Sequence, residues 1–419
     1  MVAKDIWKRN WGGNSMEWKE VTLGEIGTIV GGATPSTKNT SFYDGNIPWL
    51  TPKDLSVNSN KYILRGERNI TEAGFKSCSC KMLPKGSVLF SSRAPIGYVA
   101  ITANDMCTNQ GFKSVIPNEE TDSEFLYYLL KYNKDNIASQ GSGTTFAEVS
   151  GKTMKEIEVM VPKETDDQHR IASILSSLDR KIELNNKINA DLEEMAQAIF
   201  KNWFVDFEPF KDGKFVDSEL GMIPEGWKVG SLGDMGTIVC GKTPSKANSN
   251  YYGGDIPFIK IPDMHGKVFV ESSEDRLTEQ GSLSQIKKLI PPYSLMVSCI
   301  ATVGLVSINT KPSHTNQHIN TIIPHNKSAL FYLYQYIKNN EELLKNMGRG
   351  GTTILNVNTK SFSNIRLFIP SDIALLQFHQ IVEGLFKKIE LNMQESRTLS
   401  TLRDTLLPRL MSGELEVPE

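Results

Sequence analysis

Three short patterns in this chain resemble sites that carry out chemistry. The first runs from Gly236 to Thr243 and matches G-x4-G-K-T, the phosphate-binding loop of nucleotide hydrolases. Such a loop needs small residues whose amides curl around phosphate, and a helix that begins at the lysine. Here the interior is Thr-Ile-Val, which favours a β-strand. We therefore expect no nucleotide site at Lys242.

The second pattern, Ile290-Pro291-Pro292-Tyr293, resembles the box in which adenine methyltransferases place Asp, Asn or Ser before Pro-Pro-Tyr. That polar residue accepts a hydrogen bond from the target amine, and the Ile290 side chain cannot accept one. No glycine-rich strand for a methyl-donor cofactor stands elsewhere in the chain. We therefore expect no methyl transfer by this chain alone.

The third pattern consists of two close pairs of metal-ligand residues, Cys78-x-Cys80 and His314-x3-His318. Structural zinc requires four ligands, usually supplied by two well-spaced pairs. The two pairs stand in different parts of the chain, so the sequence predicts neither a metal nor a cofactor. No nucleophile, base and orienting residue stand at a characteristic spacing, which leaves no catalytic residue to propose.

The elements that hold these patterns repeat along the chain. Trp18-Lys19 and the following LGEIGTIVGGATPS recur 209 residues later as Trp227-Lys228 and LGDMGTIVCGKTPS. Further matches follow in the same order at offsets of 206 to 209 residues: Tyr43 with Tyr252, Gly97 with Gly304, Thr108-Asn109-Gln110 with Thr315-Asn316-Gln317, and Gly143-Thr144-Thr145 with Gly351-Thr352-Thr353. So many ordered matches indicate two half-copies in one chain.

Each half-copy has short β-rich runs, one helical patch at 123–138 or 328–346, and then a long helical segment. We predict an α+β fold in which two similar β-rich α/β domains are separated by a long antiparallel two-helix coiled coil, with a pseudo-twofold internal repeat. The predicted parts are an N-terminal extension (1–15), a first domain (16–162), a central helix (163–208), a linker (209–226), a second domain (227–370), a distal helix (371–412) and a tail (413–419).

The coiled-coil prediction rests on heptads. Positions seven apart read Ile171, Leu178, Asn185, Leu192, Ile199 in the first helix and Phe378, Leu385, Asn392, Leu399, Leu406 in the second. Each helix could instead pack on its own domain. We prefer the helix pair because a helix of ~40 residues, or ~60 Å, would extend beyond a domain of this size.

Composition narrows the class of protein. The chain has 419 residues, 39% of them hydrophobic and 22% charged, which suits two or three folded domains. Five cysteines form no disulfide framework and suit a reducing cytoplasm. The uncharged stretch 289–310 contains Pro291, Pro292 and Gly304, so we expect two buried strands joined by turns and no membrane span. Residues 227–370 carry 15 basic and 9 acidic residues, a local excess that suits a polyanion.

The order of domain, long helix, domain and long helix resembles the specificity (S) subunit of type I restriction–modification enzymes. The phrases that carry the resemblance are LFSSRAPIGYVAIT with TNQGF, GTTFAEVSGKTM, IFKNWFVDFEPF, ELGMIPEGW and LLPRLMSGEL. They lie within residues 16–416. The resemblance implies two target-recognition domains that each read half of a split double-stranded DNA site, and no catalysis by this chain. It also implies docking of two methyltransferase subunits on the helices and assembly with restriction subunits.

Two alternatives stay open beside this interpretation. The chain could be a coiled-coil assembly adaptor without its own DNA specificity, which the basic second domain argues against. It could also be a self-contained DNA-modifying enzyme, which the missing catalytic boxes argue against.

The duplication predicts where DNA contacts lie. Polar loop residues shared by both halves suit phosphate contact or turn capping, whereas residues that differ suit base readout. The candidates are Arg93, Asn109, Gln110, Lys113, Thr144, Thr145, Lys242, Ser245, Lys246, Asn316, Gln317, Arg349, Thr352 and Thr353. Each could instead be a solvated surface residue or a buried turn cap.

Asn185 and Asn392 each occupy the middle of five heptad positions. In an antiparallel pair in register the two middles meet, and the two amides could bond to each other. A buried asparagine at such a seam fixes helix register at some cost in stability. The helices could instead turn both asparagines toward solvent or toward a partner subunit.

Overall fold

The chain forms two compact units in the computed structural model, which describes residues 16–417 except 59, 94, 143–146 and 350–354. Unit 1 comprises Met1–Leu184 and Ser396–Glu419, and unit 2 comprises Asn185–Glu395. The border between the units crosses both long helices. Each unit therefore joins one predicted β-rich domain to a segment of each helix.

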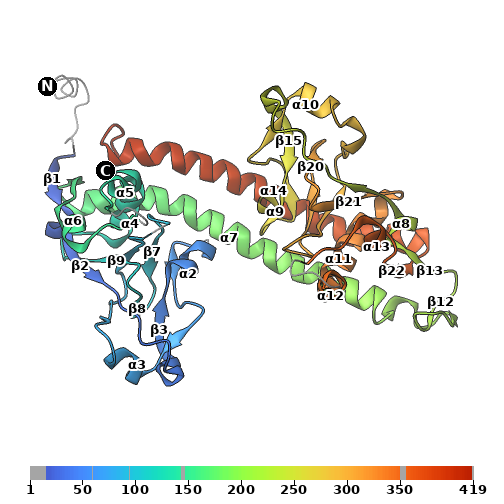
Figure 1. The fold of residues 1–419 in the computed structure, drawn as a ribbon, viewed down its shortest axis with the longest axis horizontal. Coiled ribbons are helices and arrows are strands. Elements are labelled where there is room, and N and C mark those ends of the chain that lie inside the picture. Colours follow the sequence, from blue (N-terminus) through green and yellow to red (C-terminus); the bar gives the residue numbers. More distant parts are fainter. Residues whose placement is uncertain (1–15, 59, 94, 143–146, 350–354, 418–419) are drawn as a thin grey trace. The chain divides into compact units, whose positions relative to one another are not determined.

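Unit 1 is built on a five-stranded sheet and a three-stranded sheet, with a separate pair of strands that brings the ends of the domain together. The five-stranded sheet has the order β2 (Gly27–Gly31), β9 (Lys113–Pro117), β6 (Val88–Phe90), β7 (Val99–Thr102) and β4 (Tyr62–Ile63). The three-stranded sheet has the order β5 (Asn69–Ile70), β3 (Tyr43–Leu50) and β8 (Cys107–Thr108). The pair is β1 (Trp18–Thr22) with β10 (Glu158–Pro162). In Figure 1, α3 (Glu72–Lys76) marks a lobe at the end of this domain opposite the long helix.

Unit 2 repeats this topology strand for strand. Its five-stranded sheet has the order β14 (Gly236–Cys240), β21 (Ile319–Pro324), β18 (Leu295–Ser298), β19 (Val306–Asn309) and β16 (Phe269–Val270). Its three-stranded sheet has the order β17 (Arg276–Leu277), β15 (Tyr252–Ile259) and β20 (His314–Thr315), and β13 (Lys228–Ser231) pairs with β22 (Arg366–Ile369). Because strand order and pairing agree, the predicted duplication is confirmed in the fold. The linker also contains a short hairpin of β11 (Phe215–Val216) and β12 (Ile223–Pro224).

Each predicted helical patch is divided into two helices by an asparagine. The patch at 123–138 is α4 (Ser123–Tyr132) and α5 (Lys134–Ser139), and that at 328–346 is α11 (Leu330–Asn339) and α12 (Glu341–Gly348). The Asn133 and Asn340 side chains donate to carbonyl oxygens one turn earlier, at Leu129 and Tyr336. Such bonds compete with the helical ladder and favour a helix end.

The remaining short helices repeat between the units as well. They are α1 (Leu23–Ile26), α2 (Pro52–Val57) and α6 (Gly151–Glu156) in unit 1, and α8 (Leu232–Met235), α9 (Ile261–Met264), α10 (Glu279–Leu283) and α13 (Thr359–Ser363) in unit 2. Single 3₁₀ turns lie at Thr40–Phe42, Glu208–Phe210, Ser249–Tyr251, Ile286–Lys288 and Lys327–Ala329.

The uncharged stretch 289–310 forms strands, as expected. It contains β18 and β19, which pair antiparallel in the sheet of unit 2. In the described part of the chain, no helix is both long enough and apolar enough to cross a membrane.

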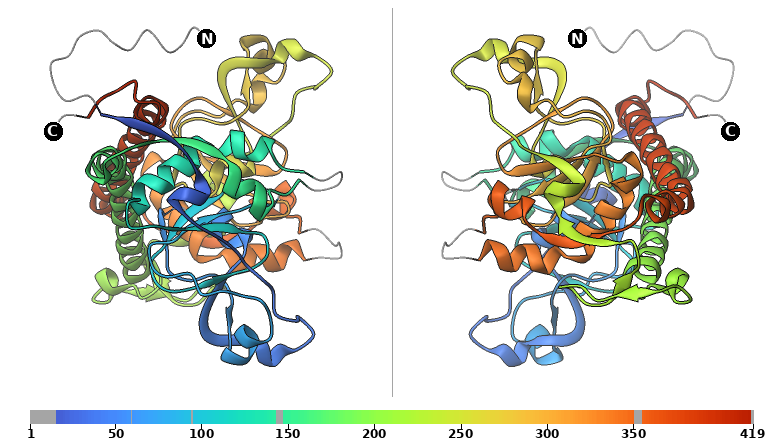
Figure 2. Two further views of the ribbon diagram at one scale, coloured as in Figure 1. Left: turned by 90° about the vertical axis from the view of Figure 1, so that its left-hand side faces the viewer. Right: turned by 90° about the vertical axis from the view of Figure 1, so that its right-hand side faces the viewer.

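The two long helices are α7 (Thr165–Phe204) and α14 (Asp372–Met411). They lie side by side and antiparallel within each unit (Figure 1 and Figure 2). In unit 2 the ring of Phe378, near the start of α14, lies 4.9 Å from that of Phe204 at the end of α7. In unit 1, Ile171 and Leu410 belong to one buried cluster. The antiparallel pairing of the two helices, predicted from the heptads, is therefore present in both units.

The two central asparagines are buried in unit 2, and their bonds differ from the direct amide pair that we predicted. Asn185 is 0% exposed and Asn392 is 1% exposed. The Asn392 amide donates to the Asn189 side-chain oxygen at 2.9 Å, and the Asn185 amide donates to the Asn392 backbone carbonyl at 3.4 Å and to Glu395 at 2.8 Å. Asn189 lies one turn after Asn185 on the same face of α7, and it can therefore take the place of Asn185 as the acceptor for the Asn392 amide. A role of these asparagines in fixing register stays a prediction.

The C-terminal end of α14 completes the core of unit 1. Leu410 and Met411 are 3% and 1% exposed, and Leu415 and Val417 pack against the same cluster. A Cβ added to Gly413 would lie 2.9 Å from the indole nitrogen of Trp18, so the tail lies directly against the start of the domain. Unit 1 is therefore assembled from the two ends of the chain.

Candidate nucleic-acid interface

Each unit contains the same backbone contact between two loops. The loop after β2 lies so close to the end of β8 that a Cβ on Gly32 would be 2.2 Å from the carbonyl oxygens of Thr108 and Asn109. In unit 2 a Cβ on Gly241 would be 2.1 Å from the carbonyl oxygen of Asn316. Only glycine fits at such an approach. We call residues 32–36 with 108–111, and residues 241–246 with 315–318, the recognition corners.

Hydrogen bonds fix each corner in the same way. The amide of Ala33 donates to Thr108 O at 3.0 Å, and the amide of Lys242 donates to Thr315 O at 2.9 Å. The phenol of Tyr43 donates to Pro35 O at 2.7 Å, and that of Tyr252 donates to Pro244 O at 2.8 Å. The loops are thus held in one conformation before any ligand arrives.

The side chains at the tip of each corner form a matching polar pair. The hydroxyl of Thr34 donates to the Gln110 carbonyl oxygen, and that of Thr243 donates to the Gln317 carbonyl oxygen at 2.6 Å. Both glutamines are exposed, and in the described residues their amino groups have no protein partner. Each glutamine is therefore oriented with its amino group exposed to solvent.

The asparagines of the two shared Asn-Gln pairs take a different role. The Asn109 side-chain oxygen accepts from the Gly111 amide at 2.9 Å, and that of Asn316 accepts from the His318 amide at 3.2 Å. These bonds make both asparagines turn caps. The asparagines therefore shape the loops, whereas the glutamines present exposed side chains.

The surroundings of the two corners differ in charge. In unit 1, Arg93 and Lys113 both pair with Glu148, at 2.9 and 3.3 Å. Burial raises the pKa of the Glu148 carboxyl, but bonds from Arg93 and Lys113 outweigh it and hold that pKa below its usual value. In unit 2 the equivalent of Lys113 is Asn320, which bonds to Cys299 and Thr359. The charged group of unit 1 thus has a neutral counterpart in unit 2.

The second corner carries its own cations. Lys242, Ser245 and Lys246 are exposed, and Lys242 stands where the first corner has Ala33. Arg349 is also exposed and donates to the Asn346 side chain at 2.8 Å. Four other predicted contact residues, Thr144, Thr145, Thr352 and Thr353, lie outside the described residues.

Sequence reasoning missed one further cation at the first corner. The guanidinium of Arg68 lies 4.2 Å from the ring centre of Tyr43, the residue that anchors Pro35. Stacking on an aromatic ring orients a guanidinium and leaves its N–H edge available. The residue at the equivalent place before β17 is Asp275, which pairs with Lys260. This reversal of charge between the repeats was the signal that could have revealed Arg68.

The three patterns set aside in the sequence lie in ordinary structure. Residues 236–240 of the G-x4-G-K-T match are β14, and Tyr293 occupies a turn with φ 59°, where the first repeat has Gly86 with φ 89°. His314 is fully buried beside the Ser282 hydroxyl at 2.8 Å, and burial lowers its pKa to about 4. Among the described residues, no group of three or more His, Cys, Asp or Glu could hold a metal ion.

Comparison with known proteins matches both halves of the chain to one family. A family model described as the type I restriction modification DNA specificity domain matches residues 15–194 and again residues 224–400. The chain belongs to the type I restriction–modification DNA specificity family. The double match covers both β-rich domains and most of each long helix, which confirms the resemblance found in the sequence.

Relatives of this family match the chain nearly end to end. The MjaIX specificity subunit of Methanocaldococcus jannaschii is 37% identical over 414 residues, which cover 96% of this chain and 94% of the relative. The HindI specificity subunit of Haemophilus influenzae is 35% identical over 95% of this chain and 100% of the relative. The crystal structure of the S subunit from M. genitalium has the same fold, with a TM-score of 0.55 at 16% identity over 96% of this chain and 98% of that one.

Proposed function

We propose that this chain is the DNA-recognition subunit of a type I restriction–modification complex. Residues 16–162 and 227–370 would be the two target-recognition domains, each reading one half of a bipartite site. The observation that carries the proposal is the repeated corner, in which Thr34–Gln110 and Thr243–Gln317 form the same pair amid different charges. Two domains that share the same loop backbone and Thr–Gln pair, but differ in the charged side chains around them, suit the recognition of two half-sites with different sequences.

The corner residues divide into two proposed classes. Gln110 and Gln317, which the repeats share, would contact the DNA backbone at both half-sites. Ser245 and the exposed lysines Lys242 and Lys246, which add cations to the second corner, would contact the backbone at the second half-site. Arg93, Lys113, Arg68 and Arg349 would contribute to base readout, because each differs between the repeats. Arg93 suits this role because its side chain is 44% exposed although its Nε already bonds to Glu148.

The partners follow from the family. We propose that methyltransferase and restriction subunits supply catalysis and that this chain supplies none. A cytoplasmic location agrees with DNA as ligand and with five free cysteines. An adaptor without DNA specificity would not need two glycine-dependent polar corners, and the family model that matches both halves describes a DNA specificity domain, which favours recognition over catalysis.

The purified chain is expected to show neither methylation nor cleavage of DNA, whereas the chain mixed with its methyltransferase subunits should methylate adenine at a split site. Incorporation of a labelled methyl group, followed by sequencing of modified bases, measures both outcomes. Methylation by the single chain would contradict the subunit role. Methylation by the complex without any split motif would contradict the two-reader arrangement.

Replacing Lys242 and Lys246 by Ala is expected to weaken binding to all DNA sequences similarly. Each lost phosphate contact should lower the slope of log affinity against log salt by about one unit. Binding titrations of the complex at several salt concentrations measure this slope. The control is Lys211→Ala with Lys214→Ala, which removes two exposed lysines from the linker. An unchanged slope in the Lys242 and Lys246 variant would show that these lysines do not contact phosphate.

A further inference from the structure

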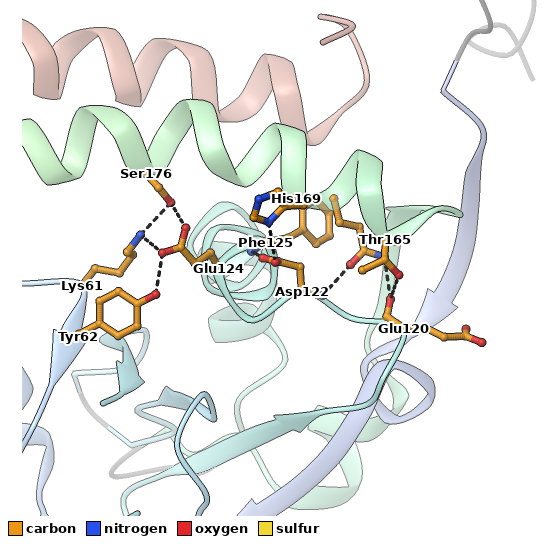
Figure 3. Close-up of polar contacts among 10 residues, drawn as sticks. Lys61, Tyr62, Glu120, Asp122, Glu124, Phe125, Thr165, His169 and Ser176 are labelled. Atoms are coloured by element: carbon orange, nitrogen blue, oxygen red, sulfur yellow. Dashed lines mark hydrogen bonds and ion pairs between the residues drawn. The ribbon is translucent and has the colours of Figure 1, made fainter. Parts of the chain in front are cut away.

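The first domain is attached to α7 through a buried lysine. Lys61 precedes β4 and is 3% exposed. Its ammonium lies 2.6 Å from Glu124 on α4 and 2.8 Å from the Ser176 hydroxyl on α7 (Figure 3). The Ser176 hydroxyl in turn donates to the other oxygen of Glu124. One closed network therefore joins the sheet, α4 and the long helix.

Further bonds surround this network. The phenol of Tyr62 donates to the Glu124 oxygen at 2.6 Å, and the Lys61 backbone amide donates to Glu183 of α7 at 2.9 Å. Burial raises the pKa of Glu124, but bonds from Lys61, Ser176 and Tyr62 outweigh it, so this pKa lies below its usual value. Glu124 is thus an anion held by three donors. We call Lys61, Tyr62, Glu124 and Ser176 the polar joint.

A second set of bonds lies at the start of α7. Figure 3 shows Asp122 and Glu120, just before α4, facing Thr165 and His169 of α7. The Thr165 hydroxyl donates to Glu120 O at 3.1 Å, and a ring nitrogen of His169 lies 3.2 Å from Asp122. Besides the apolar cluster that contains Ile171, polar bonds therefore attach the first domain to the helix both near Ser176 and at the start of α7.

Unit 2 replaces the polar joint by aromatic packing. At the offset of 207 residues that aligns the helices, Val268 stands for Lys61, Phe269 for Tyr62 and Phe331 for Glu124. The ring of Phe331 stacks on Phe386 of α14 at 4.1 Å with an interplanar angle of 8°, and Phe269 lies 6.4 Å from the same ring. Unit 2 does have a polar contact between α11 and α7, in which Lys338 pairs with Glu193, but that lysine is 37% exposed.

The two kinds of joint constrain orientation differently. Hydrogen bonds weaken steeply as their distances and angles depart from the optimum. Removing Lys61 or Glu124 from the polar joint would leave the other charge without its ionic partner, so the joint favours a single orientation. Stacked rings keep most of their contact when they slide, because dispersion has little directional preference. The joint of unit 1 is thus the stricter of the two.

We propose that Lys61 and Glu124 are positioning residues that fix the angle at which the first domain presents its recognition corner, and that this angle sets the spacer length accepted between the half-sites. The proposal rests on the proposed function. Neither residue would touch DNA. Their effect would reach the DNA because the corner and the joint belong to one compact unit, and because α7 continues as a single helix from Thr165 to Phe204.

The test uses the full chain in complex with its methyltransferase subunits. The substrates are duplexes that carry the split site found by sequencing the methylation of the wild-type complex, with the native spacer and with one base pair added or removed. Lys61→Met keeps the length of the side chain without its charge, and Glu124→Gln keeps its shape without its charge. The matched control is Lys53→Met, which removes an ion pair with Glu67 in the same domain where both side chains are exposed.

Both joint variants are expected to raise the methylation rate on the altered spacers, relative to the native one, by about tenfold or more. The control should leave that ratio unchanged. Circular dichroism shows which variants fold, and Glu124→Gln serves if Lys61→Met does not. Equal losses at all three spacers, or no change at any, would overturn the positioning role while leaving DNA recognition intact. A wild-type complex that ignores the spacer would instead overturn the proposed function.

Discussion

Replacing Asp179 by Ala is expected to lower the free energy of unfolding of unit 1 by about 3–5 kcal/mol. Asp179 is 6% exposed and lies between two helices. One carboxylate oxygen accepts from the Arg403 guanidinium at 2.7 Å, and the other accepts from the Tyr128 hydroxyl. The substitution would leave Arg403, with 18% of its side chain exposed, with Asp404 as its acidic partner, and the Asp404 side chain is 63% exposed.

Unit 2 provides the matched control for this ion pair. At the offset of 207 residues, Phe386 stands for Asp179 and Ala196 stands for Arg403, and both are fully buried. The double variant Asp179→Phe with Arg403→Ala copies this apolar arrangement and should recover most of the loss.

Hydrogen exchange measured peptide by peptide distinguishes the units. The single variant should speed exchange in α4 and in residues 165–184 of α7, whereas peptides of unit 2 should keep their wild-type rates. If Asp179→Ala had the same free energy of unfolding as the wild type, the Asp179–Arg403 ion pair would contribute nothing to the stability of unit 1. A double variant no better than the single one would show that unit 1 cannot accept the aromatic ring.

Replacing Gly241 by Ala is expected to lower the affinity of the complex for its specific DNA by about a hundredfold or more. The added Cβ would lie 2.1 Å from Asn316 O and 2.4 Å from Thr315 O, both backbone atoms that cannot rotate away. The two loops must separate, which breaks the Lys242 N–H bond to Thr315 and displaces the Thr243–Gln317 pair.

The control for this substitution is Gly384→Ala in α14. A Cβ at Gly384 would meet nothing within 4 Å, and alanine favours a helix more than glycine does. This variant should bind DNA as the wild type does. Gel-shift titrations with specific and unrelated duplexes measure both variants. If Gly241→Ala bound specific DNA with unchanged affinity, the second corner would not be part of the interface.

Much of the fold could be predicted because the sequence contains two copies of the same order of strands and helices. The strand run GTIV and the residues around it recurred at a nearly constant offset, and the strand orders of the matching sheets in the two units agree accordingly. The heptads predicted the pairing of α7 and α14 because apolar spacing reports directly which helix face is covered. The division of 123–138 at Asn133 was not predicted, since that depends on a local side-chain bond.

The side-chain partners could not be predicted to the same degree. The heptads brought Asn185 and Asn392 to the same level, but Asn189, one turn away, receives the Asn392 bond. The pairing of Arg93 and Lys113 with Glu148 joins residues up to 55 positions apart, and periodicity carries no information on such contacts. The aligned repeats already showed that Glu124 corresponds to Phe331. The sequence alone could not show that this difference changes how the domain attaches to the long helix, because that requires knowing that α4 faces α7.

The closure of unit 1 by the C-terminal end of α14 has a consequence for the order of events during translation. Unit 2 is one continuous segment, Asn185–Glu395, and can fold as soon as it leaves the ribosome. The first domain leaves earlier, yet the core that it shares with Leu410 and Met411 stays open until the last part of the chain is made. The first domain is therefore completed only after unit 2 has been synthesised, and the apolar surface that Leu410 and Met411 cover stays exposed until then.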